Sequence, residues 1–497
     1  MRLNQILLIF LISISTHCYS IEGHGLTSNL DSVVYKTMAD WKIKGLAVCI
    51  VREGKILYKK GFGFSDKKSN NKVSDSTLFM IGSATKPLMV LGVLKLVTEG
   101  KLSLDSPIQQ YLPNFQLFDS IASRKINLRS ILSHKTGLPG HDALWFTTTD
   151  TREQLVNKLR YLEPNIPYSS AFQYQNMMYM LAGYLCGEIT DQTWEEFFKN
   201  EVLVPLNMPS TYTSSNEIDN KELYSLGFMN DNPVPNHLIQ AIAPAGGVIT
   251  SIHDLSKFLE FILDEGKRVQ LINEELFQES IRKQISVPEG WNSIMMLENQ
   301  SKPLSYGFGW FISEYLNKKI VLHGGNIRGF TSLISMIPDD GIGIAIISNQ
   351  DNCRALPIIR NYILDHLLEN ENKKDWDGII KTSLSRPSTK TANNTKNGTE
   401  KQQVIFSEPT LYAGSFVNKA YGTIEIIVRE KDSFEINFNG SSGFDLQPLS
   451  KENFMVKYPG RNFPITFHFN TENRIDYISA PFEPMLPKGI IFKKTND

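Results

Sequence analysis

The chain is poor in cysteine and carries no excess of either charge. Its 497 residues include 4 cysteines without paired spacing, so no disulfide framework is expected, and Cys49 and Cys186 in apolar runs are predicted to be buried thiols. Lysine and arginine together number 51 and aspartate and glutamate 52, which gives a net charge of -1. Because no excess positive charge is present to hold a phosphate backbone, nucleic acid is not an expected partner.

The apolar run at the N-terminus is too short to span a membrane. It extends from Ile6 to Ile14, whereas a spanning helix needs roughly 20 apolar residues. A basic start, an apolar run and then small residues predict a signal peptide over residues 1–20 and no transmembrane anchor. A lipid anchor at Cys18 is the weaker alternative because the bulky His17 precedes it. We therefore expect an exported protein, either periplasmic or secreted.

Motifs for metals and phosphates are also missing. The sequence has no His-Glu-x-x-His, no glycine-rich phosphate loop and no internal repeat. His134 and His141 flank a turn without a third ligand at zinc-like spacing, which favours a structural role for both. No metal and no cofactor are therefore expected.

The patterns that are present predict an α+β fold. Residues 45–58 are apolar on both sides of a turn at Glu53-Gly54 and predict a β-hairpin. Strand patterns return late in the chain, and helical patterns lie between the two sets of strands. The strands are expected at 319–322, 331–337 and 343–348, and the helices at 79–100, 155–162, 176–189 and 253–263. Strands from distant segments predict an antiparallel sheet packed with helices.

A second domain is expected at the C-terminus. Residues 371–408 are largely polar and predict a linker after a large domain of residues 21–370. Residues 409–497 contain short alternating segments between Gly, Asn and Pro turns, which predict a small all-β barrel. Its aromatic residues are expected to fill the barrel core.

Ser83 and Lys86 form the first candidate catalytic pair. They stand three residues apart where an apolar strand-like run meets the start of a helix, so both side chains lie on one helix face. A lysine that burial keeps uncharged can accept the proton of a serine hydroxyl and so activate it as a nucleophile. The alternative is an ordinary N-cap followed by a solvated lysine. The apolar helix favours the catalytic interpretation, because burying a lysine there is costly without a task.

Two further elements carry polar side chains. Tyr174 and Asn176 project the same way from an extended segment, so Tyr174 could relay a proton and Asn176 could hold Lys86 or a substrate amide. The alternative is a packed tyrosine with Asn176 as a helix cap. His323 precedes Gly324, Gly325 and Asn326, and these small residues let a substrate backbone lie against the strand edge. His323 could bind a carboxylate or tune Tyr174 through its charge, although a lone His-Gly-Gly is more often a turn.

Taken together, the three elements resemble the serine β-lactamase-like superfamily, which includes class C β-lactamases, D-alanyl-D-alanine carboxypeptidases, D-aminopeptidases and esterases. The resemblance covers roughly residues 25–365 and extends to the connecting segments Leu102–Pro107, Tyr111–Pro113, Ile131–Pro139, Pro244–Gly247 and Tyr306–Trp310. The segment that opens at Leu411 resembles the lipocalin-like barrel appended to some of these hydrolases.

The resemblance implies a role for each candidate residue. Ser83 would be the acylated nucleophile, Lys86 its base, Tyr174 the proton relay and Asn176 a lysine or substrate contact. The backbone N–H groups of Ser83 and Asn326 would form the oxyanion hole, with Gly325 beside them.

His323 departs from the pattern of the β-lactamases, which carry the lysine of a Lys-Thr-Gly strand there, so efficient β-lactam turnover is not expected. The resulting hypothesis is a serine hydrolase acting on a small-molecule substrate, either a peptide, possibly one that contains D-amino acids, or an ester. The alternative is a non-catalytic penicillin-binding-like sensor or scaffold.

Overall fold

The computed structural model describes residues 26, 29–66, 68–146, 150–235, 239–289, 303–385, 408–429, 433–458 and 461–495. The predicted signal peptide and Cys18 lie outside these ranges. The chain divides into two compact units, the first of Met1–Ser103 with Cys186–Pro387 and the second of Leu104–Leu185 with Ser388–Asp497. The second unit therefore combines part of the predicted large domain with the C-terminal domain. Within the described ranges, no helix has the length and apolar character that crossing a membrane requires.

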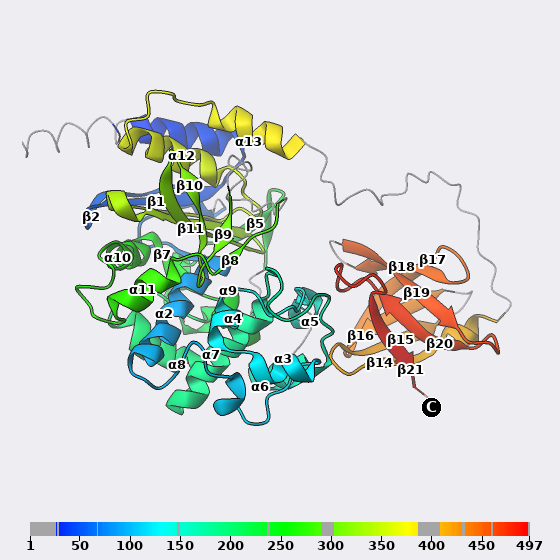
Figure 1. The fold of residues 1–497 in the computed structure, drawn as a ribbon. Helices are drawn as coiled ribbons and strands as arrows, with labels where there is room; N and C mark the ends of the chain where they lie inside the picture. Colours follow the sequence, from blue (N-terminus) through cyan, green and yellow to red (C-terminus); the bar gives the residue numbers. More distant parts are fainter. Residues whose placement is uncertain are drawn as a thin grey trace, which may run out of the picture. The chain divides into compact units, whose positions relative to one another are not determined.

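Nine strands of the described residues form one antiparallel sheet in the first unit (Figure 1). β1 pairs with β2 across the predicted Glu53-Gly54 turn and with β13 from the late part of the chain. The predicted α+β fold is thus confirmed. The spatial order is β3 (Asn71–Lys72), β2 (Lys55–Asp66), β1 (Gly45–Arg52), β13 (Ile342–Ser348), β12 (Phe330–Ile337), β11 (Lys318–Ile327), β10 (Phe311–Tyr315), β9 (Ser305–Tyr306) and β8 (Ile285–Ser286).

Helices cover both faces of this sheet, which explains why every residue of β12 and β13 is buried. Helix α10 (Ile252–Leu263) lies on one face and α12 (Leu356–Leu367) with α13 (Trp376–Ser385) on the other (Figure 1). Asp365 joins the second layer to the sheet, because its carboxylate accepts from the Tyr315 hydroxyl at 2.8 Å and from Trp376 Nε1 at 2.6 Å.

Helix α13 lies within the range that composition predicts as a linker. Trp376 and Ile380 are both buried and stand four residues apart, so they form a short apolar stripe on one helix face. The polar residues around this stripe dominate the composition of the segment and hide the helix from a compositional argument. The later part of the predicted linker, residues 386–407, lies outside the described residues.

The buried helix predicted near Ser83 is present. Strand β4 (Leu78–Met80) pairs with β7 (Ile249–Ser251), and the short turn η1 (Gly82–Ala84) then leads into α2 (Thr85–Thr98). Residues 85–94 of α2 are all buried. The remaining short elements of this unit are β5 (Gly227–Met229), β6 (Asn232–Val234), α8 (Trp194–Phe198), the π-helical turn η4 (Lys199–Leu203), α9 (Ala243–Gly246) and α11 (Glu274–Ser280).

The second unit begins with short helices, three of which start at a polar N-cap residue. Asp119, Asn127 and Thr151 accept backbone hydrogen bonds at the starts of α3, α4 and α6, as N-cap residues do. The helices are α3 (Ser120–Lys125), α4 (Leu128–Leu132), α5 (Asp142–Phe146), α6 (Arg152–Lys158) and α7 (Asn176–Thr190), whose last turn belongs to the first unit.

The C-terminal strands close into a barrel, as predicted. Among the residues described there, eight strands follow one another in order, and β14 pairs with β21 to close the ring. The rings of Tyr412, Phe434, Phe454 and Phe467 contact one another in its core. The strands are β14 (Gly414–Asn418), β15 (Gly422–Val428), β16 (Phe434–Phe438), β17 (Ser441–Pro448), β18 (Asn453–Tyr458), β19 (Arg461–Phe469), β20 (Ile475–Ala480) and β21 (Ile490–Lys494).

Candidate active site

Ser83 lies in the turn η1, which packs tightly against strand β11. Gly82 has a positive φ of 51°, and a Cβ there would stand 2.9 Å from the backbone nitrogen of Asn326. A Cβ on Gly325 would stand 2.9 Å from the backbone nitrogen of Ala84. Glycine at both positions therefore lets the backbone of β11 approach the backbone around Ser83.

Lys86 is fully buried and contacts Ser83 directly. Its Nζ donates to Ser83 Oγ at 3.1 Å and to the carbonyl oxygen of Ala245, in α9, at 2.8 Å. The relative exposure of the side chain is 0%. A lysine buried this deeply is costly unless its partners compensate, and here one partner is the candidate nucleophile. The geometry thus allows proton exchange between Ser83 and Lys86.

His323 is buried in β11 and uncharged at neutral pH. Its Nδ1 lies 2.7 Å from the carbonyl oxygen of Gly324, which can only accept, so Nδ1 carries the proton. Its Nε2 then accepts from the Tyr306 hydroxyl at 3.2 Å. Burial and, next, the positive charge of Lys86 lower the pKa of His323 to about 3. A role that depends on the charge of His323 therefore finds no support at neutral pH.

Two partners of the site were not singled out from the sequence. Tyr306 holds His323, and Ala245 supplies the carbonyl that receives Lys86. Gly309 belongs to the same segment as Tyr306, and a Cβ there would stand 3.2 Å from the carbonyl carbon of Lys86. Both segments, Tyr306–Trp310 and Pro244–Gly247, were part of the family resemblance, and this was the signal that could have identified their residues.

Tyr174 and Asn176 belong to the second unit. The ring of Tyr174 packs on the ring of His134 with centroids 4.3 Å apart, and Asn176 Nδ2 donates to Asp142 Oδ1 at 2.9 Å. Gln175 between them is fully buried, while both neighbours are half-buried. This alternation agrees with the expectation that Tyr174 and Asn176 project the same way.

The candidate residues thus fall into two sets. The structure brings Ser83, Lys86, His323, Gly325 and Asn326 together in the first unit, and it holds Tyr174 and Asn176 in the second. The convergence of the two sets stays a prediction. Within the described ranges, no group of three or more His, Cys, Asp or Glu side chains could hold a metal ion.

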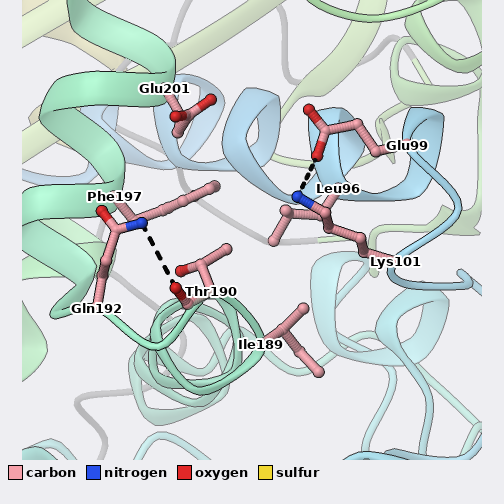
Figure 2. A pocket seen from close by; sticks show the side chains of 8 residues that line it. All are labelled: Leu96, Glu99, Lys101, Ile189, Thr190, Gln192, Phe197 and Glu201. Atoms are coloured by element: carbon pink, nitrogen blue, oxygen red, sulfur yellow. Dashed lines mark hydrogen bonds and ion pairs between the residues drawn. The ribbon is translucent and has the colours of Figure 1, made fainter.

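A pocket of about 220 Å³ lies in the first unit, away from Ser83. It surrounds the C-terminal end of α2, whereas Ser83 precedes the N-terminal end of that helix. Figure 2 shows Glu99 paired with Lys101 on one side and Gln192 bonded to Thr190 on the other. No lining residue is a nucleophile that lies beside a base. This pocket is therefore not the candidate active site. The lining residues are Leu96, Glu99, Lys101, Ile189, Thr190, Gln192, Phe197 and Glu201.

The three cysteines of the described residues, Cys49, Cys186 and Cys353, are free and buried, as predicted for the first two. Burial raises the pKa of the Cys49 thiol to about 12 and that of Cys353 to about 11. These thiols therefore stay protonated and unreactive at neutral pH.

Comparison with known proteins finds relatives whose similarity to this chain extends well beyond the candidate motifs. The chain is 25% identical over 524 aligned positions to the unguisins hydrolase ungD' of Aspergillus campestris, and the match covers 96% of this chain and 93% of that protein. It is 26% identical over 328 positions to protein flp of Staphylococcus aureus, which covers 64% of this chain and 62% of that protein.

Solved structures show the same fold. The octameric penicillin-binding protein homologue from Pyrococcus abyssi has a TM-score of 0.63 at 22% identity, covering 94% of this chain and 100% of that one. A tyrosine-to-phenylalanine mutant of a class C beta-lactamase has a TM-score of 0.59 at 18% identity, covering 69% of this chain and 97% of that one. The Beta-lactamase family model matches residues 30–368. Because this match spans most of the chain, the chain belongs to the beta-lactamase family of serine hydrolases.

Proposed function

We propose that this protein hydrolyses peptide or ester bonds through an acyl-enzyme formed on Ser83. The observation that carries the proposal is the hydrogen bond between the fully buried Lys86 Nζ and Ser83 Oγ at 3.1 Å. The hydrolase named among the relatives, which matches 96% of this chain, supports the same reaction class. The predicted signal peptide supports activity outside the cytoplasm.

The reaction would proceed in two halves. Ser83 Oγ attacks the substrate carbonyl while its proton passes to Lys86, which acts as base from its deprotonated form, and the backbone N–H groups of Ser83 and Asn326 stabilise the oxyanion. Tyr174 then relays a proton to the leaving amine or alkoxide as the bond to it breaks. Water attacks the resulting ester at Ser83, the carboxylic acid leaves, and Ser83 regains its proton.

The neutral state of His323 supports a preference within this class. A lysine at this strand position presents a positive charge to a substrate carboxylate, whereas the neutral imidazole of His323 presents none, and both of its ring nitrogens already have partners in the protein. Because burial lowers the pKa of His323 to about 3, the charge is missing throughout the physiological range. We therefore expect esters and D-amino-acid amides to be turned over faster than a cephalosporin. Comparing kcat/KM for the three substrates tests this, and the reverse ranking contradicts it.

Covalent labelling tests the nucleophile. A fluorophosphonate should label the wild-type protein and fail to label Ser83→Ala, because the probe reacts with an activated serine. Ser69→Ala, which removes an exposed hydroxyl bonded to Asp66, is the matched control and should label like wild type. Equal labelling of all three proteins would remove Ser83 as nucleophile. If the wild type is neither labelled nor active on any ester, the non-catalytic sensor or scaffold becomes the better interpretation.

A further inference from the structure

A buried polar cluster joins the barrel to the helical part of the second unit. We call it the His141 cluster, and it consists of His141, Tyr421 and Glu483. The exposed fractions of the three residues are 1%, 6% and 3%. Tyr421 directly precedes β15, and Glu483 lies between β20 and β21, whereas His141 directly precedes α5. All three belong to the second unit.

The hydrogen bonds of this cluster fix His141 on three sides. His141 Nε2 lies 3.2 Å from the carbonyl oxygen of Glu163, so Nε2 carries the ring proton. His141 Nδ1 then accepts from the Tyr421 hydroxyl at 2.8 Å. The backbone N–H of His141 donates to Glu483 Oε2 at 2.6 Å, while Glu483 Oε1 accepts from the backbone N–H of Met485 at 2.8 Å.

His141 also has a backbone conformation that needs support. Its φ is +47°, a region that a residue with a Cβ adopts only when surrounding contacts hold it there. The carboxylate of Glu483 receives the N–H of this residue, so the barrel supplies one of the contacts that hold it. Burial lowers the pKa of His141, although the nearby carboxylates of Glu483, Asp142 and Glu163 act in the opposite direction. The ring accordingly stays neutral and keeps its two hydrogen bonds.

The loop that carries His141 is bonded in turn to the Tyr174 segment. Gln173 Nε2 donates to the carbonyl of Gly137 at 2.9 Å, and Gln175 Nε2 donates to the carbonyl of Pro139 at 2.7 Å. Asn176 Nδ2 donates to Asp142 Oδ1 at 2.9 Å, one residue beyond His141. Loop 137–142 is therefore anchored to the barrel at one residue and to residues 173–176 at three points.

We propose that the barrel positions Tyr174 and Asn176 for the reaction, with Tyr421 and Glu483 acting as positioning residues through His141 and Asp142. This inference rests on the proposed function, because it assigns Tyr174 and Asn176 to the reacting site. The barrel is then more than an appended domain, since two of its side chains fix the geometry of the predicted proton relay. A small displacement of a relay group lowers the rate of the chemical step more than it lowers substrate affinity.

Two single substitutions in the full-length protein test the proposal. Tyr421→Phe removes the donor to His141 Nδ1 and keeps the ring. Glu483→Gln leaves one side-chain oxygen for two backbone N–H groups. The matched control is Tyr412→Phe, which removes a hydroxyl that donates to the carbonyl of Lys451 at 2.8 Å inside the same barrel. All three proteins are compared by hydrogen exchange of residues 137–142 and 173–177 and by kcat and KM for a p-nitrophenyl ester.

The expected result is faster exchange of both segments and a fall in kcat of about tenfold for Tyr421→Phe and Glu483→Gln, with KM nearly unchanged. Tyr412→Phe should lower thermal stability similarly but leave exchange of these segments and kcat at the wild-type values. Unchanged exchange of residues 173–177 in both cluster variants would overturn the positioning role. Faster exchange with wild-type kcat would also overturn it. Failure of the proposed function is distinguishable, because the wild-type protein would then resist fluorophosphonate labelling whatever the exchange shows.

Discussion

Two buried histidines, one in each unit, both accept a hydrogen bond from a tyrosine hydroxyl but lie among different charged groups. His323 accepts from the hydroxyl of Tyr306 on Nε2, and His141 accepts from the hydroxyl of Tyr421 on Nδ1. In each ring the other nitrogen faces a backbone carbonyl, so the two residues are opposite neutral tautomers. His323 lies near the positive charge of Lys86, whereas His141 lies near carboxylates, chiefly that of Glu483.

The difference shows how the environment assigns a role to an identical side chain. Deep burial and, while Lys86 is protonated, its positive charge oppose protonation of His323, so this ring lies beside the candidate catalytic pair as a neutral group. Near His141 burial opposes protonation and is the larger effect, while the hydrogen bond to the Glu163 carbonyl and then the nearby carboxylates favour it. In the proposed function the first histidine belongs to the candidate site, and the second belongs to the contacts that hold Tyr174 and Asn176.

Removing Lys86, which lies beside His323, should have the largest effect. Lys86→Met keeps an unbranched side chain one atom shorter but deletes the base, so kcat for an ester should fall roughly 10³-fold or more. Steady-state kinetics measures the loss, and circular dichroism confirms that the variant is folded. Lys95→Met removes the other lysine of α2, which pairs with Glu201, and serves as control. A Lys86→Met protein that retains a tenth of wild-type kcat would contradict the role of Lys86 as base.

Most of what the sequence predicted depends on local patterns. The hairpin of β1 and β2 was predictable because its turn is two residues long and both strands are apolar on at least one face. The pair Ser83 and Lys86 was predictable because the two residues stand three positions apart where turn η1 leads into helix α2. Helix α13 was missed because Trp376 and Ile380 are two apolar residues in a polar segment.

Contacts between distant segments could not be predicted in the same way. Tyr306 and His323 are 17 residues apart and lie in strands of one sheet. The contact between them was not predicted, although the segment that carries Tyr306 was recognised by its resemblance to the family. His141 and Tyr421 are 280 residues apart, and no spacing rule joins a loop before a short helix to the edge of a barrel strand. The sequence did assign His141 a structural role, but it could not name the partner.

Lowering the pH should destabilise the protein through both histidines, but by different amounts. The folded pKa of His323, about 3, lies below the unfolded value of about 6.5, so the unfolded state binds more protons between these values and stability falls as pH decreases through this window. From pH 7 to pH 5 this single group should cost about 2 kcal/mol of unfolding free energy. His323→Gln lacks the titrating ring and should lose less stability over the same interval. His141→Gln should show a change of the same sign.

Urea unfolding of wild type and both variants at pH 7 and pH 5 measures this effect. The carboxylates near His141 counteract the effect of burial on its pKa, so its contribution should be smaller than that of His323. Wild-type and His323→Gln proteins with the same pH dependence would show that His323 titrates alike in the folded and unfolded states. A larger change for His141→Gln than for His323→Gln would reverse the comparison between the two surroundings.

The smallest effect is expected from removing the hydroxyls of Tyr306 and Tyr421. We expect the first substitution to change KM and the second to change kcat. Tyr306→Phe removes the hydroxyl that donates to the buried Nε2 of His323, which costs about 1–3 kcal/mol of stability and loosens a ring of β11, the strand against which the substrate is expected to lie. Its effect should fall on KM, rising a few-fold, because the substrate is expected to lie against the strand that carries His323. Tyr421→Phe should instead lower kcat, since it loosens the segment of the proton relay. Measuring both parameters for both variants with one ester decides between these outcomes. If the two substitutions change the same parameter by the same factor, the two histidines do not have the separate roles assigned here, and the loss in each case is only that of a buried hydrogen bond.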